Sequence, residues 1–297
     1  MAPGGDRLMQ VMIFGCGYSG TAIAKAFAGE GARISGTTRS ADRLAALRDS
    51  GIEPFLFDGE SLSDDLRLAM AEATHLVQSI APRDADPLLR IIDGEFASLM
   101  PKLRWIGYLS TVGVYGDHRG AWVNEETPCT PVSGRSKERL EAEDGWMAAG
   151  RARNIPAAVL RLSGIYGPGR NAFCNLERGT ARRLIKKDQV FNRIRVEDIG
   201  AATRFLADRG LSGIYNVTDD RPGPPQDVIF EAASLMGVEP PPELPFETAE
   251  LTPMARSFYG ENKRVSNAKL KAEGFEFAFP NYPMSLAQMW QDARWRS

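Results

Sequence analysis

The stretch QVMIFGCGYSG (Gln10–Gly20) decides the fold class. It joins a short apolar run, long enough for a strand, to three glycines, Gly15, Gly17 and Gly20, in G-x-G-x-x-G spacing. In the next residues, TAIAKAFAGEGA, apolar side chains recur at helical intervals. A strand, a glycine turn and a helix in this order are typical of a dinucleotide-binding fold.

Each glycine has a separate role in such a turn. Gly15 allows the tight passage from strand to helix, Gly17 lets the backbone approach a pyrophosphate, and Gly20 lets helix and strand pack closely. The helix would begin with unpaired N–H groups and the positive end of its dipole beside the phosphates. We therefore predict a dinucleotide site here, and the alternative is a tight turn without a ligand.

Composition and charge limit the classes of partner. The 297 residues are 43% hydrophobic and 25% charged, as in globular proteins with a large core in one domain or two. A net charge of −2 argues against a nucleic-acid or anionic-membrane partner. No apolar run approaches the ~18 residues of a membrane span, and the run after MAPGGDR is too short for a signal sequence. We expect a cytoplasmic protein that acts on a small molecule.

The cysteines and histidines form no recognisable metal or disulfide pattern. Cys16, Cys129 and Cys174 are far apart and odd in number, which predicts reduced thiols. Cys16 lies inside the glycine turn, where it is either a small filler residue or a reactive thiol near a helix N-terminus. His75 and His118 cannot complete a zinc site with such scattered cysteines, so no metal is expected.

Strand-like and helix-like segments alternate as far as Leu162. Further strands are expected at Arg33–Thr38, Ile52–Phe57, His75–Ile80, Trp105–Leu109 and Ala157–Leu162. Helices are expected at Asp64–Ala71, Leu88–Met100 and Gly134–Ala149. This alternation predicts an α/β fold, a Rossmann-type doubly wound parallel sheet with crossover helices on both faces.

The pattern changes after about Pro168. Helices are expected at Asn171–Lys187, Val196–Ala207, Pro225–Met236, Asn267–Glu273 and Met284–Trp295, a strand at Gly213–Val217, and an irregular linker at Pro240–Pro253. We therefore expect a Rossmann domain of residues 8–170 plus 195–220. Residues 171–194 plus 221–297 would form a small C-terminal substrate lobe.

The end of the second strand indicates which cofactor binds. An acidic residue about 20 positions beyond the glycines would bind the ribose 2′-hydroxyl, whereas a basic one accommodates a 2′-phosphate. The segment here reads Thr37-Thr38-Arg39-Ser40, with Arg43 one turn later and no carboxylate in place. Because the arginine fork suits phosphate, we predict NADP(H) in preference to NAD(H). The alternative is that Arg39 only faces solvent.

Four more motifs follow the glycine turn: YLSTVGVYGD (Tyr108–Asp117), RLSGIYGPGR (Arg161–Arg170), RIRVEDIGAA (Arg193–Ala202) and YNVTDD (Tyr215–Asp220). In this order they resemble the extended short-chain dehydrogenase/reductases. These form the NAD-dependent epimerase/dehydratase group, which acts on nucleotide sugars and related carbonyl compounds. The G-x-G-x-x-G spacing and the later ENKRVSNAKLKAEG (Glu261–Gly274) are more similar to the family's atypical branch.

The resemblance implies roles for individual residues. The pyrophosphate would be lined by Gly15, Gly17, Tyr18, Ser19 and Gly20. The other cofactor contacts would be Arg39 at the 2′-phosphate with Thr38 as a further cofactor-binding residue, Asp58 at the adenine, Ile80 and Ala81 beside the cofactor, and Leu162, Ser163 and Gly164 near the nicotinamide. Thr111 matches the family's Ser/Thr that binds the substrate carbonyl. The resemblance also implies a homodimer.

The chain departs from the family at its catalytic Tyr-x-x-x-Lys pair. In the family, the lysine binds the nicotinamide ribose and lowers the pKa of the tyrosine, which transfers a proton. The segment here reads PVSGRSK (Pro131–Lys137), so Lys137 matches the lysine and Ser133 stands at the tyrosine position. A serine hydroxyl is shorter and a far weaker acid, so it cannot simply replace the phenol.

Three interpretations follow from this departure. In the first, which we favour, the chain is an oxidoreductase or epimerase/dehydratase, and the proton comes from Tyr115, His118, Tyr166 or a water held by Thr111 and Ser133. In the second, the chain binds NADP(H) without turnover, as a regulator or scaffold. In the third, a differently aligned loop brings another tyrosine to the site.

Basic residues in the expected substrate lobe suggest an anionic substrate, and the alternative is a solvated surface. They are Arg182, Arg183, Lys186, Lys187, Arg193, Arg195, Arg256 and Lys263, with Tyr259 nearby in the sequence.

Overall fold

The computed structural model describes residues 9–28 and 31–296. The N-terminal MAPGGDR, and Gly29 and Glu30 of the first helical pattern, lie outside the described residues. The chain divides into two compact units. The first contains the residues up to Thr111, Ser133–Arg161 and Ile199–Ile214, and the second contains Val112–Val132, Leu162–Asp198 and the residues from Tyr215 onward. The domain boundaries expected from the sequence differ from these units mainly at residues 112–132 and 162–170. The sequence analysis assigned both segments to the Rossmann domain, whereas the structure has them in the second unit.

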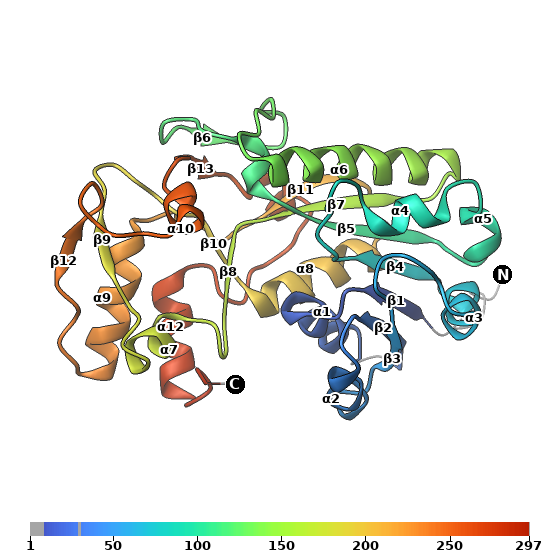
Figure 1. Ribbon diagram of the computed structural model, residues 1–297, viewed down its shortest axis with the longest axis horizontal. Helices are drawn as coiled ribbons and strands as arrows, with labels where there is room; N and C mark the ends of the chain where they lie inside the picture. The colour runs from blue at the N-terminus through green and yellow to red at the C-terminus, as the bar shows by residue number, and fades with distance from the viewer. Residues whose placement is uncertain (1–8, 29–30, 297) are drawn as a thin grey trace. The chain divides into compact units, whose positions relative to one another are not determined.

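A seven-stranded parallel sheet confirms the Rossmann-type fold class (Figure 1). Its order is β11-β7-β5-β4-β1-β2-β3. The strands are β1 (Gln10–Phe14), β2 (Arg33–Thr38), β3 (Glu53–Leu56), β4 (His75–Gln78), β5 (Trp105–Thr111), β7 (Ala157–Leu162) and β11 (Gly213–Val217). The order reverses between β1 and β4, and ligands of such sheets bind at the carboxyl ends of the strands beside this point. β4 and β7 are buried at every residue, as expected for parallel strands covered on both faces.

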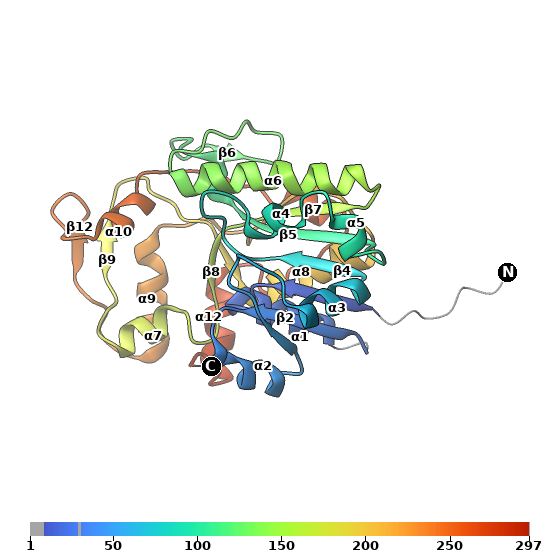
Figure 2. The ribbon, with the colours of Figure 1, turned by 45° about the vertical axis from the view of Figure 1, so that its right-hand side comes forward.

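Helices lie on both faces of this sheet (Figures 1 and 2). One face carries α3 (Asp64–Glu72), α4 (Pro87–Ile92), α5 (Phe96–Leu99) and α6 (Gly134–Ala152), and α1 (Tyr18–Ala28) and α8 (Val196–Asp208) lie on the other. The core of the first face includes Met12, Leu76, Ile106 and Trp146, all fully buried. On the second face α8 packs closely on α1, because a Cβ at Gly200 would lie 2.6 Å from the carbonyl oxygen of Ala22.

The single helix expected at Leu88–Met100 is wrong. The structure has two short helices there, α4 and α5, with a break at Asp93–Glu95. Gly94 has φ of 73°, a left-handed conformation that ends the first helix. Hydrophobic periodicity continued across the break, because both short helices bury apolar side chains in the same core.

The second unit is built from short elements. Its helices are α7 (Ala172–Glu177), α9 (Pro225–Met236), α10 (Pro253–Phe258), α11 (Ala268–Ala272) and α12 (Tyr282–Gln291). Its paired strands are β6 (Trp122–Val123) with β13 (Arg264–Val265), β8 (Gly164–Tyr166) with β10 (Arg193–Arg195), and β9 (Arg183–Ile185) with β12 (Glu243–Pro245). All three pairs are parallel and join segments far apart in the sequence.

The long helix expected at Asn171–Lys187 is also wrong. The helix ends at Glu177, and Gly179 has φ of 66°. Arg183–Ile185 instead forms β9, which pairs with β12 and adds an Arg183–Glu243 ion pair of 2.7 Å. The expected linker at Pro240–Pro253 therefore contains a strand. Tertiary pairing overrides local helix propensity here.

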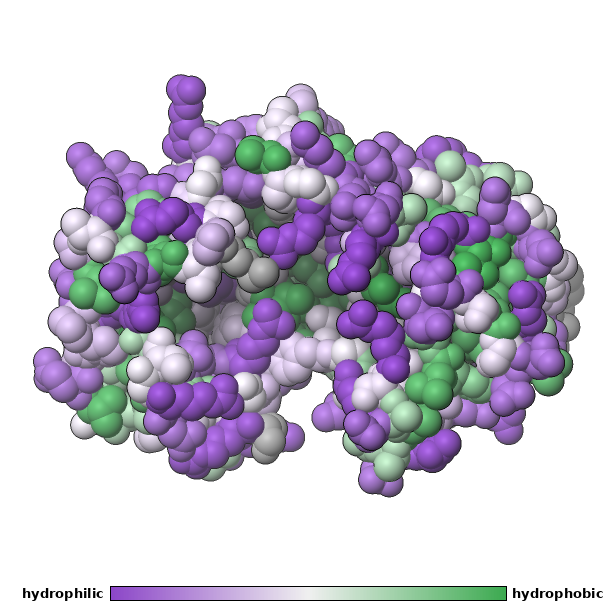
Figure 3. Space-filling model, viewed as in Figure 1, coloured by the Kyte–Doolittle hydropathy of each residue, from purple (hydrophilic) through white to green (hydrophobic). Residues whose placement is uncertain are grey.

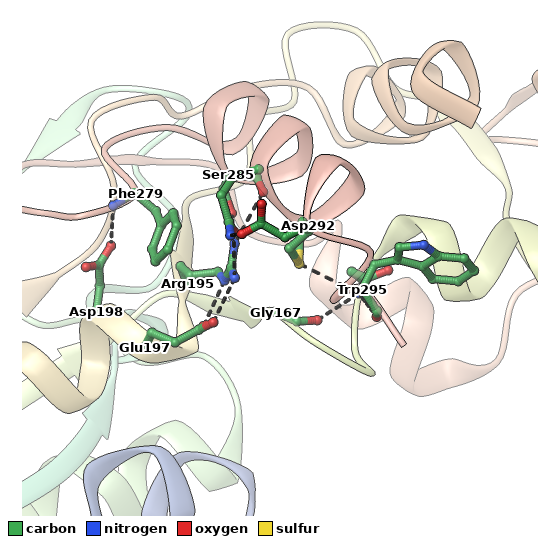
Figure 4. Close-up of polar contacts among 11 residues, drawn as sticks. Gly167, Arg195, Glu197, Asp198, Phe279, Ser285, Asp292 and Trp295 are labelled. Carbon is green, nitrogen blue, oxygen red and sulfur yellow. Dashed lines mark hydrogen bonds and ion pairs between the residues drawn. The ribbon is translucent and has the colours of Figure 1, made fainter. Parts of the chain in front are cut away.

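Arg195 joins β10 to α12 inside the second unit (Figure 4). Its guanidinium pairs with Glu197 at 2.7 Å, donates to the hydroxyl of Ser285 at 2.8 Å, and stacks on the ring of Phe279. Trp295 closes the neighbouring core, where its carbonyl accepts from the amide of Asn171 at 2.7 Å. Because Arg195 is 2% exposed, it holds the fold and does not bind an anionic substrate.

In the described part of the chain, no helix combines the length and the apolar character that crossing a lipid bilayer requires. The face drawn in Figure 3 is mostly hydrophilic.

Candidate cofactor and catalytic site

The three glycines of the turn differ in the space around them. Gly15 has φ of 90°, and a Cβ there would lie 2.9 Å from Cγ1 of Ile80. A Cβ at Gly20 would lie 2.6 Å from the carbonyl oxygen of Gly15. A Cβ at Gly17, by contrast, would meet no described atom within 4 Å. Gly15 and Gly20 are therefore explained by the fold itself, whereas Gly17 leaves open space at the turn.

Cys16 is a buried filler residue. It is 1% exposed, and burial raises the pKa of its thiol to about 12, which favours the small filler residue over the reactive thiol. A Cβ at Gly36 of β2 would overlap the Cys16 sulfur, so the two residues fit each other. Thr37 holds the turn to β2, because its hydroxyl accepts from the amide of Gly15 at 3.0 Å and its carbonyl from the amide of Cys16 at 2.8 Å. The sequence alone did not show the Cys16–Gly36 fit.

Two arginines lie at the end of β2. Arg39 and Arg43 are exposed, and within residues 9–28 and 31–296 neither forms an ion pair with a carboxylate. Two effects act on the pKa of Cys16: burial raises it, and the positive charge of Arg43 lowers it by a smaller amount. The Arg43 guanidinium therefore acts electrostatically on the glycine turn. Thr38 is buried, and its hydroxyl accepts from the amide of Ser40 at 3.3 Å. The end of β2 therefore offers positive charge next to the turn.

Asp58 follows β3 and is exposed. Its carboxylate accepts from the backbone amide of Glu60 at 2.8 Å, and this hydrogen bond lowers the pKa of Asp58. Asp58 is therefore an exposed carboxylate that is ionised at neutral pH.

A buried network that the sequence analysis missed positions Ile80 after β4. The amide nitrogen of Ile80 donates to Oε1 of Gln78 at 3.1 Å. Nε2 of Gln78 donates to Asp86 at 3.0 Å, and Nε1 of Trp146 donates to the same carboxylate at 3.1 Å. Asp86 also caps α4, so the Asp-Pro at the start of that helix was the available signal. Ile80 is half-buried and Ala81 is exposed.

Ser133 is the N-cap of α6. Its hydroxyl oxygen accepts from the backbone amide of Ser136 at 3.1 Å, and its proton is donated to the Ser136 hydroxyl at 2.9 Å. Lys137 lies in the first turn of the helix and is exposed. Thr111 is half-buried at the end of β5. All three residues belong to the first unit.

A buried ion pair ties α6 to the strands beside it. Glu143 of α6 and Arg161 of β7 are 2% and 3% exposed, and their closest atoms are 2.7 Å apart. The hydroxyl of Ser110, next to Thr111, donates to the same carboxylate at 2.5 Å. Arg139 of α6 also donates to the carbonyl of Leu109 in β5. These bonds place the end of β5 beside α6, and the sequence analysis did not foresee them.

Several known proteins are similar to this chain, while no family model matches it. A structure of a functionally unknown conserved protein from Silicibacter pomeroyi DSS is 46% identical, with a TM-score of 0.86, over 96% of this chain and 99% of that one. A structure described as a candidate NAD-dependent epimerase/dehydratase from Methylobacillus flagellatus is 26% identical, with a TM-score of 0.72, over 97% and 100%. Protein YeeZ of Escherichia coli K12 is 29% identical over 92% and 97%.

The structural neighbours of this chain are members of the NAD-dependent epimerase/dehydratase family, consistent with the resemblance to the extended short-chain dehydrogenase/reductases. A UDP-glucuronic acid 4-epimerase from Bacillus cereus, 13% identical with a TM-score of 0.76, shares the fold.

Against this family, the departure at Ser133 has a structural consequence. Its hydroxyl oxygen accepts one hydrogen bond and its proton is donated in another, both within the first turn of α6. Ser133 therefore acts as a helix cap, a role that stabilises the helix by about 1 kcal/mol, and its hydroxyl is not poised to transfer a proton.

The alternative proton donors belong to the second unit. Tyr115 is fully buried, and its hydroxyl donates to Oδ1 of Asn216 at 2.8 Å. Burial raises the pKa of Tyr166 well above its ordinary value, which makes it a poorer acid. His118 is half-buried, and its Nε2 donates to the carbonyl of Tyr115 at 3.0 Å. Each of these groups has a structural role in the second unit.

The residues expected near the nicotinamide are the first three of Leu162–Asp198, a segment of the second unit. Leu162 and Ser163 are buried, and Gly164 is exposed at the start of β8. The backbone amide of Ser163 donates to the carbonyl of Val217, and that of Gly164 to the carbonyl of Asn192. They belong to the second unit, and their place near the nicotinamide stays a prediction.

Proposed function

We propose that the chain binds NADP(H) and acts as an oxidoreductase or epimerase/dehydratase on a carbonyl or nucleotide-sugar-type substrate. The observation that carries the cofactor proposal is the pair Arg39 and Arg43, exposed at the end of β2 and without a carboxylate partner among the described residues. Arginine side chains recognise a 2′-phosphate through charge-assisted hydrogen bonds. The open space at Gly17 supports a pyrophosphate at the turn.

The residues of the first unit would have distinct roles in such a site. The backbone of Gly15–Gly20 and the N-terminus of α1 would hold the pyrophosphate, and Lys137 would bind the nicotinamide ribose. Thr111 would donate a hydrogen bond to the substrate carbonyl. When bound, the cofactor would supply or accept a hydride.

Cofactor titrations of four proteins test this assignment. We expect Arg39→Ala and Arg43→Ala each to weaken NADPH binding by about 10-fold or more, since a hydrogen bond to a charged group contributes about 1.5–3 kcal/mol. NADH binding should change little. Arg48→Ala, which removes an exposed arginine from the last turn of α2 (Leu44–Asp49), is the matched control. Equal binding of NADH and NADPH by the wild type would contradict the assignment.

The cap role of Ser133 favours a second candidate function, that of a non-catalytic NADP(H)-binding regulator. Turnover of NADPH on panels of carbonyl compounds and nucleotide sugars distinguishes the two functions. If the chain is an enzyme, Lys137→Ala should abolish turnover, whereas Arg135→Ala on the same exposed turn should not. Tight NADPH binding without turnover on any panel would favour the regulator. A gain of carbonyl reduction in Ser133→Tyr would support the assignment of the missing phenol.

Fewer basic residues of the second unit are now candidates for binding an anionic substrate. Arg183 and Lys263 are already paired with Glu243 and Glu261. Lys186 and Arg256 instead lie over the ring of Phe246, 5.2 and 5.0 Å from its centre, and neither has a carboxylate partner among the residues that the structure describes.

A further inference from the structure

Trp122 is unusually exposed for a tryptophan. It occupies the first position of the two-residue strand β6 and is 61% exposed, whereas the next residue, Val123, is buried. Pairing with β13 holds the strand in place, with the amides of Arg264 and Ser266 donating to the carbonyls of Ala121 and Val123 at 2.9 Å. The indole is therefore presented to solvent by a fixed backbone.

A pocket of about 310 Å³ lies beside this indole. It is lined by Trp122, Val123, Asn124, Thr127 and Ser266, all in the second unit. Its size is at the lower end of the range for small-molecule sites, about 300–1,000 Å³. None of the five lining side chains is ionisable. The nearby Glu125 faces inward, because its carboxylate accepts from the amide of Asn216 at 2.8 Å.

The polar groups of the pocket are fixed and have unused hydrogen-bond donors. Oδ1 of Asn124 accepts from the amide of Glu126 and the hydroxyl of Thr127, both at 3.1 Å, which orients its side chain. Within the described residues, Nδ2 of Asn124 donates to no protein group. The hydroxyl oxygen of Ser266 accepts from the amide of Ala268 at 3.3 Å, and its proton is free to be donated.

We infer that this pocket binds a neutral polyhydroxylated ligand, a monosaccharide or a sugar unit of a larger molecule. A flat exposed indole packs against the C–H face of a sugar ring, while amide and hydroxyl donors bind its hydroxyl groups. The lack of charge in the lining disfavours phosphorylated or carboxylated sugars, whose charge would find no partner there. The inference concerns residues of the second unit and does not depend on the proposed cofactor.

Tryptophan fluorescence of the full chain provides the test. Trp122 is the most exposed tryptophan, since Trp105, Trp146 and Trp295 are buried and Trp290 is half-buried. We expect D-glucose or N-acetyl-D-glucosamine to cause a saturable change with a dissociation constant on the order of 1–10 mM, as for a small, shallow site. D-glucuronate and glucose 6-phosphate should bind at least about fivefold more weakly.

Three variants identify the site. Asn124→Asp keeps the acceptor that holds the turn but replaces the amide donor, and it should weaken binding at least about fivefold. Trp122→Ala, followed by saturation-transfer NMR because the reporter is lost, should weaken binding to the same extent or more. Phe258→Ala removes another exposed aromatic ring outside the pocket and should leave sugar binding unchanged.

Three results would overturn the inference. They are no saturable response to either neutral sugar at about ten times the expected dissociation constant, tighter binding of the charged sugars, or unchanged binding by folded Asn124→Asp and Trp122→Ala. NADPH binding measured on the same samples is a separate readout, so failure here and failure of the proposed cofactor are distinguishable.

Discussion

Alanine at Gly17 and alanine at Gly20 should have opposite effects. At Gly17 the new Cβ meets no described atom within 4 Å, and φ is not positive, so the fold accepts alanine. Replacing glycine at such a position raises the free energy of unfolding by about 0.4–1 kcal/mol, because the unfolded chain loses freedom. At Gly20 the Cβ would lie 2.6 Å from the carbonyl oxygen of Gly15, a backbone atom that cannot move aside. Such overpacking costs about 1–3 kcal/mol.

Cofactor binding should separate from stability in the Gly17 variant. If the pyrophosphate contacts the backbone at Gly17, the methyl group occupies its place, and a penalty of about 1–3 kcal/mol weakens NADPH binding by about 5- to 150-fold. Calorimetric titration with NADPH measures this loss, and thermal unfolding without ligand measures stability. Gly20→Ala is the control that loses stability. A Gly17→Ala protein that binds NADPH as tightly as the wild type would refute the placement of the pyrophosphate.

Three other changes test buried side chains: a carboxyl group, an ion pair and an aromatic ring. Burial raises the pKa of Asp219 from 3.8 to about 7, so this carboxyl lowers the free energy of unfolding progressively as pH rises from about 4 to about 7, by up to about 4 kcal/mol. Asp219→Asn should remove that decline, so the melting temperature of the variant relative to the wild type should rise as pH increases from about 4 to about 7. Parallel curves of melting temperature against pH for the two proteins would contradict the explanation. Glu143→Gln leaves Arg161 buried without its counter-charge and should lower the free energy of unfolding in urea by about 3–5 kcal/mol, whereas a loss below ~1 kcal/mol would mean that the pair is not needed. Trp295→Ala removes a buried ring packed on Phe173 and should cost about 3–5 kcal/mol in the same assay, unless the cavity collapses.

Local patterns of the sequence determined much of the first unit. β2 and β7 have the predicted bounds, and α1 follows the glycine turn as expected. These elements were predictable because strand and helix periodicity and the backbone freedom of glycine act over a few neighbouring residues. The exchange of a family tyrosine for Ser133 was also visible in the sequence, since it needs only the spacing to Lys137.

Tertiary structure alone decided how distant segments meet. Arg183–Ile185 became a strand because Glu243–Pro245 lies beside it, and no local pattern revealed that partner some sixty residues away. The fit of Cys16 to Gly36 and the Glu143–Arg161 pair likewise join separate elements. The sequence thus determined the fold class and the position of the glycine turn, because these depend on neighbouring residues. The cap role of Ser133's hydroxyl, the burial of Arg195 and the exposure of Trp122 depend on which groups the folded chain brings together, and only the tertiary structure decided them.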